Sequence, residues 1–285
     1  MKTSPSKLFN LGCGPTIAKG WMNFDISPIN EEVKYWHANN PIPASDCSVD
    51  VIYHSHMLEH LNHSSAKKFL KDCYRVLKKS GVMRVVVPDL ELICTDYLKA
   101  IQRVDKGEKL GKFDATWMRL ELFDQMTRDS SGGGMEKFLK SNPPNSKFIL
   151  NRCGEQVESF FKKKDDGSSQ IRKISIPFHL RVKSLINRTM NFDKIRDLCL
   201  KILLGETDFT ALKYGRFHGC GELHKFMYDR ILIEDILQDI GFSNIIIQSH
   251  SQSNIPNWNV YGLDSTSTGQ ARKPDSLYME AIKSS

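Results

Sequence analysis

The sequence predicts an α/β fold in which a mostly parallel sheet of seven strands carries a helical insertion after the fifth strand. Two observations predict the sheet. Short apolar runs rich in β-branched and aromatic residues alternate with segments of helical periodicity near both ends of the 285-residue chain. Strands that alternate with helices form a parallel sheet covered on both faces. The middle of the chain abandons this alternation, which predicts the insertion.

Five strands are expected in the first ninety residues. The apolar runs that predict them cover residues 7–12, 21–26, 31–38, 48–56 and 81–89. Between the last two runs, apolar side chains of residues 62–81 recur at helical spacing. Ser64 or Ser65 is the expected N-cap of this helix, and Gly81 lies just past its expected end.

The C-terminal residues resume the alternation of helix and strand. Asp229 is the expected N-cap of a helix that ends at Gly241 and buries a stripe of leucines and isoleucines. Residues 243–250 predict the next strand. Residues 276–285 predict the last strand, because two sets of side chains alternate along it.

The chain between these halves predicts an insertion. We expect residues 1–89 and 223–285 to form one domain and residues 90–222 to form a mostly helical insertion. Residues 130–148 are punctuated by glycine and proline and predict a break between helices, whereas residues 160–173 are charged and predicted to be exposed. An insertion after the fifth strand emerges near the carboxyl edge of the sheet, where open α/β sheets bind ligands.

The composition is that of a soluble globular protein. Hydrophobic residues make up 40% of the chain and charged residues 26%. No apolar run has the length of a signal peptide or of a membrane span, so we expect a cytoplasmic protein. The seven cysteines form no CxxC pair, and their spacing predicts neither a metal site nor a disulfide framework.

The net charge of +7 is concentrated in the middle of the chain. Residues 101–183 carry 17 basic and 11 acidic side chains. Such an excess could attract an anionic substrate, a nucleic acid or a membrane surface. It could also be a solvated helical face with surplus lysines, which we favour because acidic residues interleave with the basic ones.

The stretch "NLGCGP" after the first expected strand is the first candidate site. A dinucleotide loop needs a third glycine, where Ile17 stands, and a full helix before its acidic residue. Only ten residues separate Gly14 from Asp25, too few for that helix and a second strand. Gly12 and Gly14 let the backbone pass close to a ligand, and Asp25 could accept hydrogen bonds from a ribose. The pattern suits a nucleoside without phosphates, although plain turn glycines and a surface cap are the alternative.

Four later stretches give this loop a context. In order they are "SVDVIYHSHMLEHL", "YRVLKKSG", "VVVPD" and "HKFMYD". Together with the glycine loop they resemble the class I S-adenosylmethionine-dependent methyltransferases, above all small predicted bacterial enzymes that modify glycans and small molecules. The resemblance covers about 90 residues at the start and about 60 at the end. It implies a Rossmann-like fold and S-adenosyl-L-methionine as the cofactor.

The resemblance also implies cofactor-binding residues. The amino-acid part of the cofactor would lie in the loop of Asn10, Gly12, Cys13 and Gly14, and the ribose would bind to Asp25. The adenine would pack against Ile26 and lie beside His37, Ala38 and Asn39. The methionine part would lie beside Ser55, His56 and Leu58. Three departures stand out. An acid common before the glycine loop is replaced by Asn10, an acid near the adenine is replaced by His37, and the usual first helix has no room.

Acceptor-side residues follow from the same resemblance. His56, Asp89 and His224 are the candidates for catalysis, Tyr228 is expected to line the same pocket, and Glu59 and His60 are expected to be structural. A hydroxyl acceptor needs a base to take its proton, and the expected pocket offers histidines and a carboxylate. This favours O-methylation of a saccharide or another small hydroxylated acceptor. Trp117, Phe123 and Met126 of the insertion would form the lid over it.

Two alternatives remain at this point. One is an RNA-directed methyltransferase, suggested by the basic middle third; binding of nucleic acid is disfavoured because "SHMLEH" stands where an N-P-P-Y-like motif is expected. The other is a protein that binds S-adenosylmethionine without turnover, suggested by His37 at the adenine position. The oligomeric state is left open.

Overall fold

The computed structural model describes residues 6–162 and 192–284. These residues divide into two compact units. The first comprises the described parts of Met1–Arg128, Gly132–Phe161 and Leu223–Ser285, and the second comprises Asp129–Ser131 with the described part of Lys162–Glu222. The first unit therefore holds both the sheet and the first helices of the insertion. The predicted boundaries at residues 89 and 222 stay a prediction.

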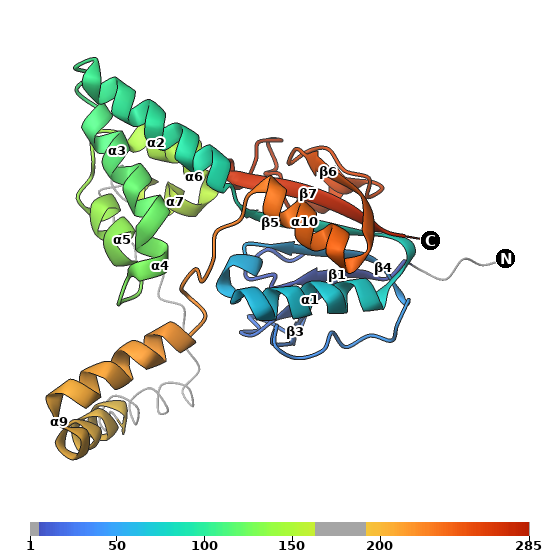
Figure 1. Cartoon of the computed structure of the whole chain (residues 1–285), viewed down its shortest axis with the longest axis horizontal. Coiled ribbons are helices and arrows are strands. Elements are labelled where there is room, and N and C mark those ends of the chain that lie inside the picture. Colours follow the sequence, from blue (N-terminus) through green and yellow to red (C-terminus); the bar gives the residue numbers. More distant parts are fainter. Residues whose placement is uncertain (1–5, 163–191, 285) are drawn as a thin grey trace, which may run out of the picture. The chain divides into compact units, whose positions relative to one another are not determined.

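The seven predicted strands form one sheet within the described residues (Figure 1). They are β1 (Leu8–Leu11), β2 (Met22–Asp25), β3 (Val33–Tyr35), β4 (Val49–Ser55), β5 (Leu77–Pro88), β6 (Phe242–Gln248) and β7 (Ser276–Lys283). Their order is β3-β2-β1-β4-β5-β7-β6. The first five strands are parallel, and β7 runs antiparallel to both β5 and β6. The predicted mostly parallel sheet is confirmed.

Helices α1 (His63–Val76) and α10 (Arg230–Ile240) pack against each other and cover one face of this sheet (Figure 1). The main apolar core lies between them and the strands, with Phe9, Phe69 and Leu237 among its fully or nearly fully buried members. The opposite face is covered by the chain around α11 (Trp258–Tyr261), in a cluster of aromatic rings. Both faces are therefore covered, as the alternation of strands and helices predicts.

The ends of these two helices test the sequence-based caps. Asp229 caps α10 as predicted, since its side chain accepts a hydrogen bond of 2.8 Å from Leu232 N. The predicted cap of α1 is wrong: the N-cap is Asn62, two residues before Ser64, and its side chain accepts a hydrogen bond of 2.8 Å from Ser65 N. The predicted end of α1 is also wrong, because Leu77 already pairs with Val49 as part of β5.

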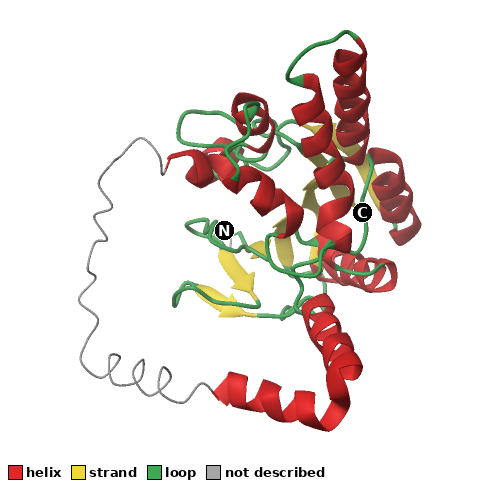
Figure 2. Cartoon of the chain, turned by 90° about the vertical axis from the view of Figure 1, so that its left-hand side faces the viewer, coloured by secondary structure: helices red, strands yellow, loops and turns green. Residues whose placement is uncertain are grey.

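The insertion begins directly after β5 and builds a core of its own (Figure 2). Its helices in the first unit are α2 (Leu90–Asp105), α3 (Gly111–Arg119), the π-helical η2 (Leu120–Asp124), α4 (Gln125–Thr127), α5 (Gly133–Lys140), α6 (Ser146–Cys153) and α7 (Glu155–Lys162). Trp117 lies at the centre of this core, without exposed surface. Trp117 therefore has no surface to offer an acceptor, whereas Phe123 is exposed. The predicted lid stays a prediction.

The predicted break over residues 130–148 is wrong for much of its length, because α5 and the start of α6 lie inside it. Its glycines mark the first turn of α5 instead. The Asp124 carboxylate accepts hydrogen bonds from Gly134 N and Met135 N, at 2.7 and 3.1 Å. A side chain from an earlier helix thus caps a sequence that by itself predicts a loop.

The second unit contains helix α9 (Phe192–Gly219), which is interrupted at Gly205 by a non-helical backbone conformation. Most of the segment predicted to be charged and exposed, residues 160–173, lies outside the described residues. No helix in the described ranges is both long and apolar enough to cross a bilayer.

Candidate functional site

The strand order changes direction between β1 and β4, whose carboxyl ends therefore form a topological switch point. From β1 the chain moves outward to β2 and β3, and it then returns to the other side of β1 to form β4. Open α/β sheets bind their ligands at such a switch point. The glycine loop after β1 and the residues after β4 meet here, because Gly12 packs against Met57.

The backbone of the glycine loop is tied to the second strand. The N–H groups of Gly12 and Cys13 both donate to Phe24 O, at 2.8 and 3.0 Å. Gly12 has a φ of 66°, and a Cβ atom there would lie 2.8 Å from Met57 Sδ. Gly14 also has a positive φ, 51°, but a Cβ atom there would have no neighbour within 4 Å. Gly12 therefore serves packing, whereas Gly14 borders open space.

This difference predicts unequal effects of two matched substitutions. Gly14→Ala should lower the free energy of unfolding by about 1–2 kcal/mol, the cost of a left-handed conformation for a residue with a Cβ. Gly12→Ala should lower it by about 2–4 kcal/mol, because Met57 must also move. Urea denaturation of both variants measures the difference. Equal losses would show that the Met57 contact does not restrict Gly12.

No helix follows this loop, and two buried amides hold it instead. Residues 12–21, all described, contain only turns and irregular backbone. Asn10 Nδ2 donates to Thr16 O and to Asn23 Oδ1, both at 2.9 Å. The same Asn23 Oδ1 accepts from Ala18 N at 3.1 Å. The expectation of a missing first helix is confirmed, and Asn23 is a residue that the sequence analysis missed.

Asp25 stands at the end of β2 with its carboxylate oriented by the loop. Its Oδ2 accepts from Gly14 N and its Oδ1 from Ser27 N, each at 2.8 Å. Each oxygen keeps a further lone pair for a hydroxyl donor. Ile26 beside it is exposed, as a residue that packs on an adenine would be. Binding of the ribose by Asp25 stays a prediction.

The residues predicted near the adenine edge border a cavity. His37 Nδ1 accepts a hydrogen bond of 3.0 Å from Asn39 N, so the imidazole shapes its own turn. Ala38 and Asn39 line a surface cavity of about 320 Å³ together with Asn40, Pro41, Ser65, Lys68, Phe69 and Asp72. Their contact with the adenine stays a prediction.

His56 follows β4 in a strained conformation, with a φ of 51°. Its Nε2 lies 2.8 Å from Ser276 Oγ and its Nδ1 lies 3.4 Å from Glu59 Oε1. Burial, helped by the charge of Lys273 and by neighbouring histidines, holds the pKa of His56 well below 6.5, so the imidazole is neutral. Non-glycine residues with such backbone strain cluster at functional sites.

Two other residues predicted on the cofactor side have different surroundings. Ser55 Oγ accepts a hydrogen bond of 3.1 Å from Lys273 Nζ, which reaches it from the loop before β7. Leu58 has no exposed surface and belongs to the main core. A contact between Leu58 and the cofactor would therefore come from its backbone.

The segment before α10 docks onto η1 (Leu58–His60) and completes the acceptor side. Lys225 N donates to Glu59 O at 2.7 Å, and the rings of His60 and His224 lie 4.8 Å apart at 86°. Burial lowers the pKa of His224 to about 3. The structure thus brings His224 close to the loop that carries His56.

Asp89 lies at the end of β5 and caps the following helix. Its Oδ1 accepts from Leu92 N at 3.1 Å, and burial raises the pKa of its carboxyl group. Tyr228 lies beside it, joined by a single bridge between the two backbones. Asp89 therefore has a structural contact, and its part in catalysis stays a prediction.

The structure adds Glu59, which the sequence analysis expected to be structural. Its side chain has no exposed surface, and neither carboxylate oxygen has a hydrogen-bond partner among the described residues. Burial raises its pKa to about 8. The nearest ring nitrogen is His56 Nδ1, at 3.4 Å from Oε1. No sequence pattern distinguishes such a carboxylate from one that is paired.

Comparison with known proteins gives one family match. Residues 21–85 match the model of a methyltransferase domain, a stretch that runs from β2 into β5 and includes Asp25, His56 and Glu59. No curated protein matches the chain.

Solved structures that overlap with the chain include three at low identity. A SAM-dependent methyltransferase from Archaeoglobus fulgidus is 12% identical, with 98% of this chain and 86% of that chain covered and a TM-score of 0.37. A possible histamine N-methyltransferase from Thermotoga maritima is 12% identical, with 99% and 84% covered and a TM-score of 0.38. A putative methyltransferase in complex with the Trm112 methyltransferase activator of Haloferax volcanii is 9% identical, with 99% and 84% covered and a TM-score of 0.37.

Three findings on the described chain point to the same kind of domain. The sheet has the seven strands and mostly parallel direction that the sequence motifs imply. The glycine loop and Asp25 meet at its switch point. The matched family model covers the strands that follow the loop. Residues 21–85 are therefore similar to a methyltransferase domain, and the described sheet has the Rossmann-like order that such a domain implies.

Proposed function

We propose that this chain is an S-adenosylmethionine-dependent methyltransferase that acts on a hydroxyl group of a saccharide or another small hydroxylated acceptor, and that His56 takes the proton. The observation that carries the proposal is the position of His56 at the carboxyl end of β4, with Nε2 2.8 Å from Ser276 Oγ and Nδ1 3.4 Å from Glu59 Oε1. Burial also holds the pKa of His56 well below 6.5, which favours the neutral imidazole. The position lies at the switch point of the sheet, next to the loop expected to hold the methionine part of the cofactor.

The chemistry asks two things of the protein. The acceptor oxygen forms a bond to the methyl carbon while the bond from that carbon to the sulfonium breaks, so the two partners must be aligned. The hydroxyl loses its proton in the same process, and a positioned base accelerates this step. A neutral imidazole can accept that proton. Glu59 lies 3.4 Å from Nδ1 and would stabilise the resulting cation once its own buried carboxyl group has lost its proton.

The surroundings support a polar acceptor. Side chains of Glu59, His60, His224 and Tyr228 present buried polar atoms around this position, and several of these atoms have no hydrogen-bond partner in the described chain. Unpaired polar groups favour a ligand that brings its own hydroxyls, because they recover hydrogen bonds on binding.

Methyl transfer with labelled cofactor tests the proposal. Purified protein is incubated with S-adenosylmethionine labelled in its methyl group and, separately, with saccharides, small hydroxylated compounds, amines and total RNA. We expect label in a hydroxylated acceptor. Label confined to amines or RNA would overturn the proposal, and absence of transfer to every acceptor would favour a binding protein without turnover.

The substitution His56→Asn tests the base. Asparagine tolerates the left-handed backbone found at this position, so the loop is retained. We expect kcat to fall by about 10²–10⁴-fold, with little change in the KM for S-adenosylmethionine. His218→Asn, at an exposed histidine of α9, is the control. An unchanged kcat in His56→Asn would exclude His56 as the base.

The pH profile provides a second test of His56. A histidine base works only when neutral, and an ordinary histidine becomes protonated below about pH 6.5. Because burial holds the pKa of His56 well below 6.5, kcat should stay level as the pH falls from about 7.5 to 6.5. A fall in the kcat of the wild type with a midpoint near pH 6.5, absent from the residual activity of His56→Asn, would show that burial does not lower the pKa of His56.

A further inference from the structure

We propose that Glu59, His60 and His224 form a binding site for a zinc ion. Each of the three residues offers one ligand atom, and these atoms lie within 4.8 Å of one another. Glu59 and His60 belong to η1 after β4, whereas His224 comes from the segment before α10. The inference concerns metal binding alone and does not rest on the identity of the methyl acceptor.

The ligand atoms are buried and lack partners in the described chain. Both carboxylate oxygens of Glu59 and the Nδ1 atom of His224 have no hydrogen bond there. A buried polar atom without a partner costs about 1–3 kcal/mol. Unpaired buried atoms on two residues of a cluster whose ligand atoms lie within 4.8 Å of one another indicate a site whose partner is a ligand. The nearest alternative partner, His56 Nδ1, lies 3.4 Å from Glu59 Oε1.

His60 is oriented as histidine ligands of metals usually are. Its Nδ1 lies 3.1 Å from Leu223 O, and a carbonyl oxygen only accepts, so Nδ1 carries the hydrogen. The lone pair is then on Nε2. Histidines that bind a metal commonly donate their other ring N–H to a carbonyl or a carboxylate in this way. The perpendicular ring of His224, 4.8 Å away, faces the same site.

The set of donors favours zinc over calcium or magnesium. Hard cations take mostly oxygen ligands, whereas two imidazoles and one carboxylate are a known set for catalytic zinc, with a fourth position left open. Ligand atoms around a tetrahedral zinc ion lie about 3.3 Å apart, given bonds of about 2.0–2.1 Å. The three side chains therefore need to close by roughly 1.5 Å at most, which rotation of the side chains can supply.

The bound ion would join distant parts of the chain. Lys225 N already donates to Glu59 O at 2.7 Å, so the backbones of the two segments are fixed next to each other. Burial lowers the pKa of His60, and the positive charges of Arg128, Lys273 and Lys225 lower it further. These charges oppose a cation, so the carboxylate of Glu59 is the ligand on which the site should depend most.

Zinc binding to the whole chain tests the proposal. Protein treated with a chelator and desalted is titrated with Zn²⁺ in a calorimeter, and the metal content is measured after gel filtration. We expect one zinc per chain and a higher thermal midpoint in its presence. Absence of stoichiometric zinc in the folded wild type would overturn the proposal, as would tighter binding of Mg²⁺ or Ca²⁺.

Substitutions locate the ion. Glu59→Gln and His224→Gln should each lower zinc affinity by on the order of a hundredfold or more, since even partners of the ligands are worth 10–100-fold. His218→Gln, at an exposed histidine of α9, should bind as the wild type does. Circular dichroism and binding of S-adenosylmethionine show whether each variant is folded. Wild-type affinity in both folded ligand variants would place any zinc elsewhere and overturn the proposal.

Discussion

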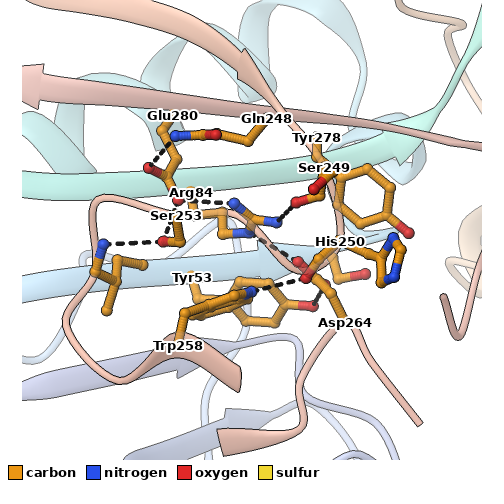
Figure 3. A network of polar contacts seen from close by, with 12 residues as sticks. Tyr53, Arg84, Gln248, Ser249, His250, Ser253, Trp258, Asp264, Tyr278 and Glu280 are labelled. Atoms are coloured by element: carbon orange, nitrogen blue, oxygen red, sulfur yellow. Dashed lines mark hydrogen bonds and ion pairs between the residues drawn. The ribbon is translucent and has the colours of Figure 1, made fainter. Parts of the chain in front are cut away.

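Replacing Arg84 with methionine is expected to lower the free energy of unfolding by about 3–5 kcal/mol, because removing one partner of a buried ion pair leaves the other charge uncompensated. Arg84 lies in β5 without exposed surface (Figure 3). Its Nε donates to Asp264 Oδ2 and its Nη1 to Glu280 Oε1, each at 2.7 Å. Its Nη2 donates to Ser249 O at 2.7 Å. The substitution leaves two buried carboxylates without their counter-charge.

The surroundings of Arg84 sharpen this expectation. The guanidinium lies 4.5 Å from the ring centre of Trp258, and Asp264 also accepts a hydrogen bond of 2.6 Å from Tyr53 Oη (Figure 3). These contacts tie the loop after β6 to three strands, so their loss is not confined to one side chain. Since the network lies on the sheet face away from α1, we expect the folded fraction to bind S-adenosylmethionine normally.

Urea denaturation measures the loss, and Arg75→Met is the matched control. Arg75 also contacts two carboxylates, Asp46 and Asp72, but it lies at the surface, where such pairs contribute about 0–1 kcal/mol. Adding Asp264→Asn and Glu280→Gln to Arg84→Met should restore part of the stability. Equal losses in the two single variants would show that the buried network contributes no more than a surface pair.

Replacing Asp25 with alanine is expected to lower the affinity for S-adenosylmethionine by about a hundredfold or more. Two hydrogen bonds from ribose hydroxyls to a carboxylate would be lost, at about 1.5–3 kcal/mol each, and each 1.4 kcal/mol is tenfold in affinity. The substitution also frees Gly14 N and Ser27 N, so the loop loses the side chain that orients it.

Calorimetric titration with S-adenosylmethionine measures this effect. Asp25→Asn keeps one acceptor oxygen without the charge, so its affinity should fall between those of the wild type and Asp25→Ala. Glu31→Ala removes an exposed carboxylate from the following loop and should bind as the wild type does. A loss of less than tenfold in Asp25→Ala would mean that Asp25 only shapes the loop.

Much of the fold could be predicted because its signals are local. Each strand of the sheet has its own apolar run, and the cap at Asp229 is set by the residues next to it. The errors come from contacts between distant residues. Asp124 caps a helix that begins among glycines. The burial of Trp117 is missed for the same reason, because its helical spacing is the same in a buried core as in a lid.

The two sides of the candidate site differ in the same way. The cofactor side is encoded within the first forty residues, so its loop and Asp25 could be placed in advance. On the acceptor side, Lys273 and Ser276 reach Ser55 and His56 from more than 200 positions away. The exposure of Glu59, and therefore its proton affinity, depends on that packing, which no pattern in the sequence records.

The central place of β7 in the sheet has a consequence for the order of assembly. β7 leaves the ribosome after the other six strands of this sheet, yet it lies between β5 and β6, and Ser276 at its start contacts His56. A nascent chain can form the parallel half of the sheet early, but β6 has no strand to join until β7 emerges. Pairing of such distant segments is slow. The contact between Ser276 and His56 therefore forms only long after the glycine loop and Asp25 have been synthesised.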